Sequence, residues 1–389
     1  MGMQKNQSLL VMVIGLMPLH AVASEGDSKP LSAITSFVRH VGTFIDSMAV
    51  KGVDRNYIDA PKEPWQVILR GNVNQTDLKM KSTFNGAMFY GVEGDVNWES
   101  RIKTIPSAYA GLWAGYRGYG IGYSWNVGGD KGTILTFGAT GGSYGVNLRI
   151  HHFENDNPEV HYAGRFLDEE TGTYQNEAHT EDGVLWNPVR TRTLILDGYY
   201  LFNGKRFSYA AAYDQSVIQK RSAGSLMAGA MYYHGHTRYD TKEDADFILL
   251  MNDIGRIKQW QVSVGVGYAY NWVPVKGLLV SAMAMPMLTF YNHLKVWRYG
   301  SNYRDMALVN EWHEDDELPF TEYEIWPIGE TSQNSHMTLN FDARLSLTYQ
   351  WSRFFVNAYG QFNNFRYGHD NNSGRLNDWF INAAIGVRL

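Results

Sequence analysis

The last strand, residues 379–389, constrains the fold of this chain more than any other stretch. Its odd positions are Trp, Ile, Ala, Ile, Val and Leu, whereas the even positions between Phe380 and Arg388 are Asn, Ala and Gly. Successive side chains of a strand point to opposite faces, so one face here is continuously apolar and the other is small or polar. A soluble sandwich would cover the apolar face with a second sheet. Behind an export signal, lipid is the favoured partner, and the pattern predicts a strand of a transmembrane β-barrel.

The N-terminus has the three parts of a secretory signal peptide, which we assign to residues 1–23. Lys5 supplies the positive start, 9–19 the apolar run and Ala21-Val22-Ala23 the cleavage site. That run is too short to span a bilayer as a helix, and a buried N-terminal helix is the alternative. We assign residues 24–62 to a periplasmic helix and linker, with apolar positions at helical spacing over 31–48. Residues 63–389 form the predicted barrel.

Composition narrows the partners and cofactors. The chain has no cysteine, which excludes disulfides and thiolate metal sites, and its net charge is −5 without a basic tract, which argues against nucleic acid. Its 12 Trp and 25 Tyr suit a sheet whose rims lie in a membrane interface. The expected partners are outer-membrane lipids and lipopolysaccharide, the barrel-assembly machinery and a small-molecule solute. We expect no cofactor.

The two-residue period of the last strand recurs along the whole chain. The strands that it predicts cover about 65–75, 105–116, 118–127, 133–140, 143–153, 191–202, 222–237, 257–272, 277–294, 335–350, 353–366 and 378–389. Twelve is an even number, as closure with both termini on one side requires, and ten or fourteen are the alternatives. The stretch 278–290 is apolar on both faces, which the pattern does not explain.

The connections alternate between short turns and long polar stretches. The long ones, 76–104, 154–190, 238–256, 295–334 and 367–377, are predicted to be exterior loops. On the other, periplasmic side, 203–221 is the one long connection. Either the helix over 31–48 plugs the lumen, or it packs against the end of the barrel.

The connection 203–221 and the strand start after it carry a resemblance to a known family. The run from Tyr199 to Tyr209, Gln215-Ser216 and 219–225, together with Tyr57-Ile58 and Pro61 ahead of Trp65, resembles an outer-membrane barrel family of Bacteroides-type bacteria that is catalogued as a domain of unknown function. The most specific residues of this segment are Phe207, Ser208, Tyr209, Gln215, Ser216, Arg221, Ser222, Ala223, Gly224 and Ser225. Where the family suggests proline, this chain has Ala210, which predicts a less rigid turn. The resemblance implies the fold and no particular activity.

Charged side chains on the polar strand faces are the first candidates for a functional site. They are Arg70, Arg149, Asp197, Asp342, Arg344 and Arg388, all predicted to line the lumen. Asp342 and Arg344 are two residues apart and therefore share a face. They either select or bind a charged solute, or form ion pairs that fill the interior.

The other polar groups favour simpler interpretations. His151-His152 and His234-Gly235-His236 lie where strands meet exterior loops, and without a third ligand we expect solvated histidines and no metal site. Acidic residues crowd 154–182 and 311–330, where they either bind divalent cations beside lipopolysaccharide or are solvated.

These observations predict an all-β chain, a transmembrane antiparallel barrel of about twelve strands. The expected role is a channel or binding protein for a small solute, or a structural component of the envelope. The alternatives are a lipid-modifying hydrolase and a surface scaffold or adhesin. We identify no catalytic residue, because a serine–histidine triad is recognised by geometry rather than by sequence spacing.

Overall fold

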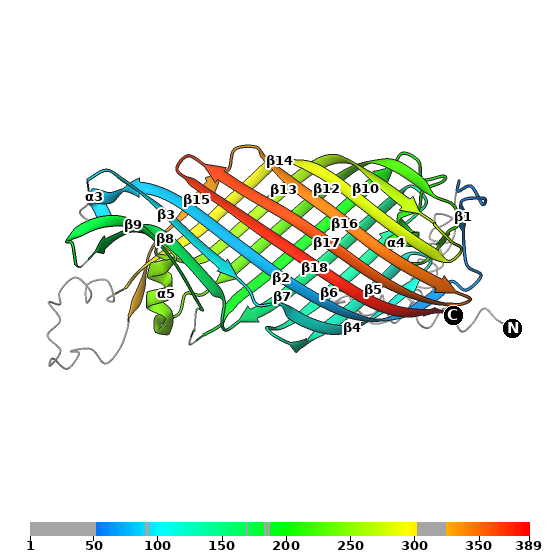
Figure 1. The fold of residues 1–389 in the computed structure, drawn as a ribbon, viewed down its shortest axis with the longest axis horizontal. Helices are drawn as coiled ribbons and strands as arrows, with labels where there is room; N and C mark the ends of the chain where they lie inside the picture. The colour runs from blue at the N-terminus through cyan, green and yellow to red at the C-terminus, as the bar shows by residue number, and fades with distance from the viewer. Residues whose placement is uncertain (1–51, 90–92, 169, 183–184, 186, 302–323) are drawn as a thin grey trace, which may run out of the picture.

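The computed structural model describes residues 52–89, 93–168, 170–182, 185, 187–301 and 324–389, so the predicted signal peptide and the helix over 31–48 lie outside the described residues. Within these ranges twelve strands form one closed antiparallel barrel, in the order predicted from the sequence (Figure 1). They are β2 (Trp65–Asn85), β4 (Ser107–Tyr116), β5 (Tyr119–Gly128), β6 (Lys131–Thr140), β7 (Tyr144–Asn155), β10 (Val189–Leu201), β12 (Ala223–Arg238), β13 (Ile254–Trp272), β14 (Leu278–Ser301), β16 (Thr338–Trp351), β17 (Phe354–His369) and β18 (Asn372–Arg388).

The last strand closes the barrel against the first. β18 pairs with β2 from Asn372↔Ser82 to Arg388↔Gln66, and the amide of Leu389 donates to the carbonyl of Trp65 at 2.8 Å. The start of β2 and the end of β18 lie at one end of the barrel, here called the termini end, and the opposite end is called the far end (Figure 1). With this pairing no edge of the barrel sheet is left open.

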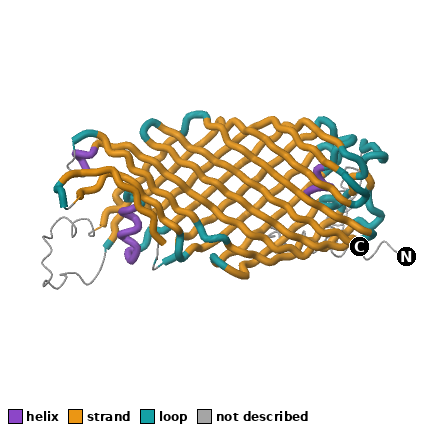
Figure 2. The backbone as a smooth tube through the Cα atoms, viewed as in Figure 1, coloured by secondary structure: helices purple, strands orange, loops and turns teal. Residues whose placement is uncertain are grey.

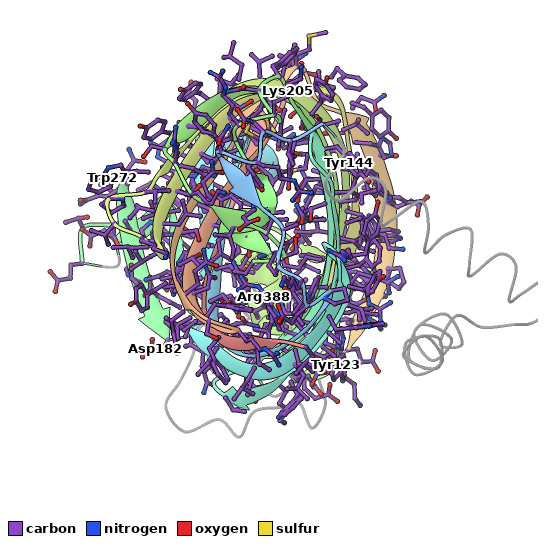
Figure 3. All side chains as sticks on the ribbon, turned by 90° about the vertical axis from the view of Figure 1, so that its right-hand side faces the viewer. Tyr123, Tyr144, Asp182, Lys205, Trp272 and Arg388 are labelled. Carbon is purple, nitrogen blue, oxygen red and sulfur yellow. The ribbon has the colours of Figure 1, made fainter. Side chains whose placement is uncertain are left out.

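Exposure alternates along the strands as the sequence pattern predicts. On β16, Leu345 is 60% exposed, whereas its neighbours Arg344 and Ser346 are buried. Seen along the barrel, Trp272 and Tyr123 point outward and Arg388 points into the interior (Figure 3). The apolar face is therefore the outer surface, and the polar face fills the inside.

The expectation of loops is wrong for four long connections, which contain paired strands. In 367–377, β17 continues to His369 and β18 begins at Asn372. β2 continues to Asn85 and pairs with β3 (Asp95–Lys103). β3 in turn pairs with β8 (Glu159–Asp168), which forms a hairpin with β9 (Thr173–Asp182). β15 (Ile325–Asn334) pairs with the last part of β14, and these strands lie at the far end (Figure 2). β3 has one buried face with Val96, Trp98 and Ile102, and its other face is polar. Ion pairs such as Arg101–Asp77 at 2.6 Å also join neighbouring strands.

Short helices complete the structure. α3 (Gly86–Phe89), the 3-10 helix η1 (Lys242–Asp244) and α5 (Ala245–Leu250) lie at the far end, and α4 (Tyr209–Tyr213) lies nearer the termini. Phe247 and Ile248 of α5 pack with Ile102, Val160 and Val189 in a buried cluster. Among the described residues, the structure has no helix that is both long and apolar enough to cross a membrane.

Candidate functional site

The connection 203–221 is folded into the barrel, and we call it the plug segment. The segment remains the connection between β10 and β12, and Tyr209 and the alanines after it are buried. Polar side chains on the inner wall bind its backbone. Ser346 donates to the carbonyl of Ala212 at 2.6 Å, and Gln66 donates to the carbonyl of Asp214 at 2.7 Å. The polar inner faces of the strands therefore satisfy a buried segment of irregular backbone.

Local sequence explains the fold of the plug segment. The hydroxyl of Ser208 accepts from the amide of Ala211 at 3.2 Å and caps α4. After the helix, Gln215 adopts a φ of 59°. The expected turn at Ala210 is instead the first turn of this helix, where a backbone N–H has no helical partner and proline is tolerated.

The segments that carry the family resemblance meet in the structure. β1 (Ile58–Asp59) pairs with β11 (Ile218–Gln219), and the guanidinium groups of Arg206 and Arg221 lie 5.2 and 5.9 Å from the ring centre of Tyr57. Gln219 donates to the carbonyl of Arg206 at 2.7 Å. The plug segment is thereby fixed to the chain that precedes the first barrel strand.

The remaining residues of the resemblance join the plug segment to the wall. Phe207 is fully buried, and the amide of Ser216 donates to the Asp214 carboxylate at 2.8 Å. At the start of β12, the hydroxyl of Ser222 accepts a hydrogen bond from the amide of Val273 at 2.9 Å. Asn203 donates twice to the same strand start, from its amide to the Ser225 hydroxyl at 3.0 Å and from its side chain to the Gly224 carbonyl at 2.8 Å. Ala223 packs against the interior cluster. These contacts give the motif residues a structural role, which is to hold the plug segment against the wall of the barrel.

Arg344 is the centre of the interior charge network. Its guanidinium lies 2.9 Å from a carboxylate oxygen of both Asp342 and Asp197, and it donates to the hydroxyl of Tyr209 in the plug segment. Its side chain is 1% exposed. The three charges are buried and paired with one another, which favours the interpretation that they fill the interior over the one in which they line an open path.

Two further arginines also bind inside the barrel. Arg149 forms an ion pair with Asp378 and lies 5.2 Å from the ring centre of Phe380. Arg388 donates to the carbonyl of Gln215 at 2.8 Å, which anchors the end of the plug segment. Both guanidinium groups are thus bound to the wall or to the plug segment, and among their buried atoms only Nη1 of Arg388 lacks a hydrogen-bond partner.

Arg70 differs from the other interior arginines. It faces a cavity of about 130 Å³ between the wall and the plug segment, donates to the hydroxyl of Thr136 at 3.0 Å and lies 4.9 Å from the ring centre of Trp113. Its Nε has no hydrogen-bond partner, and no carboxylate among the described residues forms an ion pair with it. A buried cation without a counter-charge is costly, so an anion in the cavity would stabilise this position.

The stretch 278–290 is explained by the interior. Met283, Met285 and Met287 on β14 point inward and pack with Met227 and Met231 of β12. Flexible thioether side chains fill the irregular space beside the plug segment. The apolar residues between them face outward, which is why both faces read as apolar.

The histidine predictions are partly wrong. His151 is 3% exposed and points inward, where its ring nitrogens contact the Tyr109 hydroxyl at 3.0 Å and the Asn74 amide at 3.5 Å. His234 stacks on Trp260 at the barrel surface. A phenol and an amide are not the serine and carboxylate of a hydrolase, so these contacts do not assemble a triad around His151.

The structure describes most of the acidic stretch 154–182 and only the last part of the stretch 311–330. Within the described residues, Glu159 pairs with Lys103 at 3.1 Å, Glu154 with Arg190 at 3.2 Å, and Asp168 accepts from the amide of Glu170 at 3.0 Å. Most of the second acidic stretch lies outside the described residues. The paired carboxylates favour a structural role over cation binding.

Sequence reasoning did not identify Trp113 and Thr136 beside Arg70. The available signal was glycine, since a Cβ at Gly122 would collide with the Arg70 guanidinium. Glycine opposite an inward arginine therefore makes room for it.

Closure of twelve strands, an apolar exterior and a packed polar interior define the class of outer-membrane β-barrels. The Domain of unknown function (DUF4421) family matches residues 52–388, and the chain belongs to this family. The match confirms the resemblance to a family that is catalogued as a domain of unknown function. No curated protein matches the chain.

Solved structures with similar folds are outer-membrane proteins. The outer membrane protease OmpT from Escherichia coli has a TM-score of 0.41 at 9% identity, covering 84% of this chain and 97% of that one. An outer membrane channel from Pseudomonas putida has a TM-score of 0.26 at 11% identity, covering 85% and 97%. Similarity at this level carries no information about activity.

Proposed function

We propose that this protein is an outer-membrane barrel that is closed at rest and binds a small acidic solute in its interior. The apolar outer surface suits lipid, and the predicted signal peptide would direct export. The plug segment occupies the half of the interior nearest the termini, which is the periplasmic end in barrels of this class. Binding rather than steady passage is the function that this arrangement supports.

The single observation that carries the proposal is the Arg70 guanidinium beside an interior cavity. The three other inward arginines bind carboxylates or the plug backbone, whereas Arg70 has one hydroxyl and an aromatic face. A guanidinium matches a carboxylate with two parallel hydrogen bonds.

The size and lining of the cavity limit the solute. Its volume of about 130 Å³ is close to that of an engineered cavity that holds benzene. Trp113, Ile68 and Phe380 supply apolar wall, and Asn382 and Gln361 supply amides. Charged side chains also line the cavity, among them the paired Arg344 and Asp197, Arg149, which is paired with Asp378, and Asp214. A carboxylic acid with a short apolar body fits both the charge and the wall.

Thermal unfolding of the folded barrel in detergent, with propionate as the probe, tests this proposal. A ligand at a hundred times its Kd stabilises the folded state by about 2.7 kcal/mol, so propionate should raise the Tm. Propionamide, which has the same shape without the charge, should leave the Tm unchanged. Arg70→Gln should abolish the propionate effect and Arg70→Lys should retain part of it.

An equal propionate effect in wild type and Arg70→Gln would contradict the proposal, because the site would then lie elsewhere. A wild-type Tm that responds to no small carboxylate would contradict it as well.

A further inference from the structure

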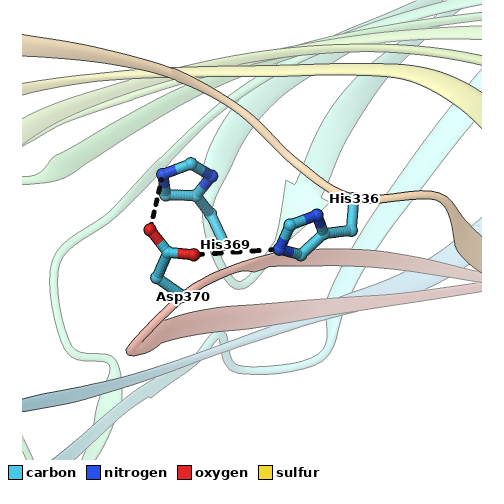
Figure 4. A group of neighbouring side chains, drawn as sticks. All are labelled: His336, His369 and Asp370. Atoms are coloured by element: carbon cyan, nitrogen blue, oxygen red, sulfur yellow. Dashed lines mark ion pairs between the residues drawn. The ribbon is translucent and has the colours of Figure 1, made fainter.

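Two histidines and an aspartate meet at the far end of the barrel, remote from the interior cavity. His336 lies in the link between β15 and β16, His369 ends β17, and Asp370 begins the turn to β18. Figure 4 shows the three side chains turned toward one another. The Asp370 carboxylate lies 3.3 Å from Nε2 of His369 and 3.9 Å from Nε2 of His336, and all three ligand atoms lie within 4.8 Å of one another.

A second contact fixes the orientation of one ring. Nδ1 of His369 lies 2.8 Å from the carbonyl oxygen of Asn334. A carbonyl oxygen only accepts, so Nδ1 carries a proton, and Nε2 is the ring nitrogen left for a metal on the side of Asp370. Metal-binding histidines have this arrangement, with the far nitrogen donating to a carbonyl or carboxylate.

The backbone holds the two segments together. The amide of His336 donates to the carbonyl of Gly368 at 2.9 Å, and the hydroxyl of Ser335 both donates to that carbonyl at 2.8 Å and accepts from the Gly368 amide at 2.9 Å. Asp370 adopts a φ of 45° in the tight turn. The two segments that carry the three side chains are therefore held side by side by hydrogen bonds.

The spacing suits a tetrahedral cation. Bonds of about 2.0–2.1 Å from zinc to imidazole nitrogen set neighbouring ligand atoms about 3.4 Å apart in a tetrahedron. The distance from Nε2 of His369 to Oδ2 of Asp370, 3.3 Å, already has this value, and the distance from Nε2 of His336 to the other oxygen, Oδ1, is 3.9 Å. Rotation of the His336 and Asp370 side chains has to bring both nitrogens toward one of these oxygens, starting from ligand atoms that lie within 4.8 Å of one another. Calcium and magnesium prefer an all-oxygen shell, which two imidazoles do not supply.

We propose that His336, His369 and Asp370 bind one zinc ion at the far end of the barrel. The two Nε2 atoms and one carboxylate oxygen provide three ligands, and the fourth position faces solvent, since His336 and Asp370 are each 73% exposed. The ion would join the β15–β16 link to the β17–β18 turn. Its open position makes the site exchangeable, and the site is independent of solute binding at Arg70.

Calorimetric titration of the full folded barrel in detergent with Zn²⁺ alone tests the site. Wild type should bind one equivalent, and His336→Ala, His369→Ala and Asp370→Asn should each weaken binding by at least about tenfold. His179→Ala is the matched control, because His179 is also partly exposed and lies 3.2 Å from a carboxylate oxygen of Glu177. It should bind Zn²⁺ as wild type does.

Two further readouts separate a built site from scattered surface histidines. Binding should weaken from about pH 7.5 to about pH 5.5, because imidazole must lose its proton to bind a metal, and Ca²⁺ should not compete. Heat-modifiable gel mobility establishes that each variant is folded. Wild-type binding that His336→Ala and His369→Ala leave intact, or the absence of a one-equivalent binding step, would overturn the proposal.

Discussion

Replacing Arg344 with methionine should be among the most destabilising single changes in the barrel. The substitution removes the cation that lies 2.9 Å from both Asp342 and Asp197, while all three side chains are at most 5% exposed. Removing one partner from a buried ion pair costs about 3–5 kcal/mol, because the remaining charge is left without compensation in a low dielectric. We expect Arg344→Met to cost at least that much, since two carboxylates lose their partner.

Asp342→Asn provides the graded comparison. It leaves Arg344 paired with Asp197, and a neutral amide still accepts a hydrogen bond, so we expect a cost of about 1–3 kcal/mol. The triple variant Asp197→Asn, Asp342→Asn, Arg344→Met has no charge in the network and should recover most of the loss. Urea unfolding in detergent, followed by tryptophan fluorescence, measures each free energy of unfolding.

The refuting result is an Arg344→Met barrel within about 1 kcal/mol of wild type. Carboxylates that tolerate the loss of their cation would have to be hydrated. The interior would then be a wet path rather than a packed core.

Three further predictions concern the membrane, the far end and conduction. Leu345→Arg on the outer surface should cost about 2–4 kcal/mol in lipid vesicles, whereas Ile328→Arg, equally exposed on β15 beyond the barrel, should be near neutral; equal costs would contradict the assigned lipid face. Burial acts to raise the pKa of Asp240, but hydrogen bonds from Tyr299, Arg238 and Arg256 outweigh this effect and lower the pKa. The stability that the Asp240 carboxylate contributes is therefore present above the pKa of the unfolded state and is lost as the pH falls through the pKa of the folded state. Asp240→Asn should remove this acid dependence from the hydrogen exchange of α5, and an unchanged pH profile would refute the assignment. In planar bilayers, wild type and Asp342→Asn should both lack a steady current, and a shift of reversal potential in the variant would show that Asp342 lines an open path.

The membrane topology gives one more test on intact cells. An epitope after Gly172, in the exposed turn between β8 and β9, should be labelled from outside, and one after Lys276, in the turn between β13 and β14 at the termini end, only after permeabilisation. Reversed labelling would contradict the assignment of the termini end to the periplasm.

The barrel itself could be predicted from the sequence because its signal is local. Lipid requires apolar side chains outside and backbone pairing throughout, so apolar and polar or small residues alternate along each membrane strand, as in 379–389. The extension of β2 to Asn85 carries Leu78, Met80 and Phe84 on one face, but charged residues lie between them, so the segment resembles a polar exterior loop.

The plug segment and the candidate sites depend on contacts that have no local signature. Nothing in the spacing of Ser346 and Ala212, or of Arg70 and Thr136, indicates that they meet. The same holds for His336 and His369, which become neighbours through the pairing of the 335–336 backbone with Gly368. Sequence reasoning identified which side chains face inward, but their partners come only from the closed fold.

The most direct test of solute binding in the closed barrel is a crystal of the protein soaked with 3-bromopropionate. Our account predicts an anomalous bromine peak in the interior cavity beside Trp113, with the carboxylate bound to the Arg70 guanidinium, and no such peak in Arg70→Gln crystals. A cavity that stays free of bromine in wild type while the Arg70 guanidinium binds only water would contradict it.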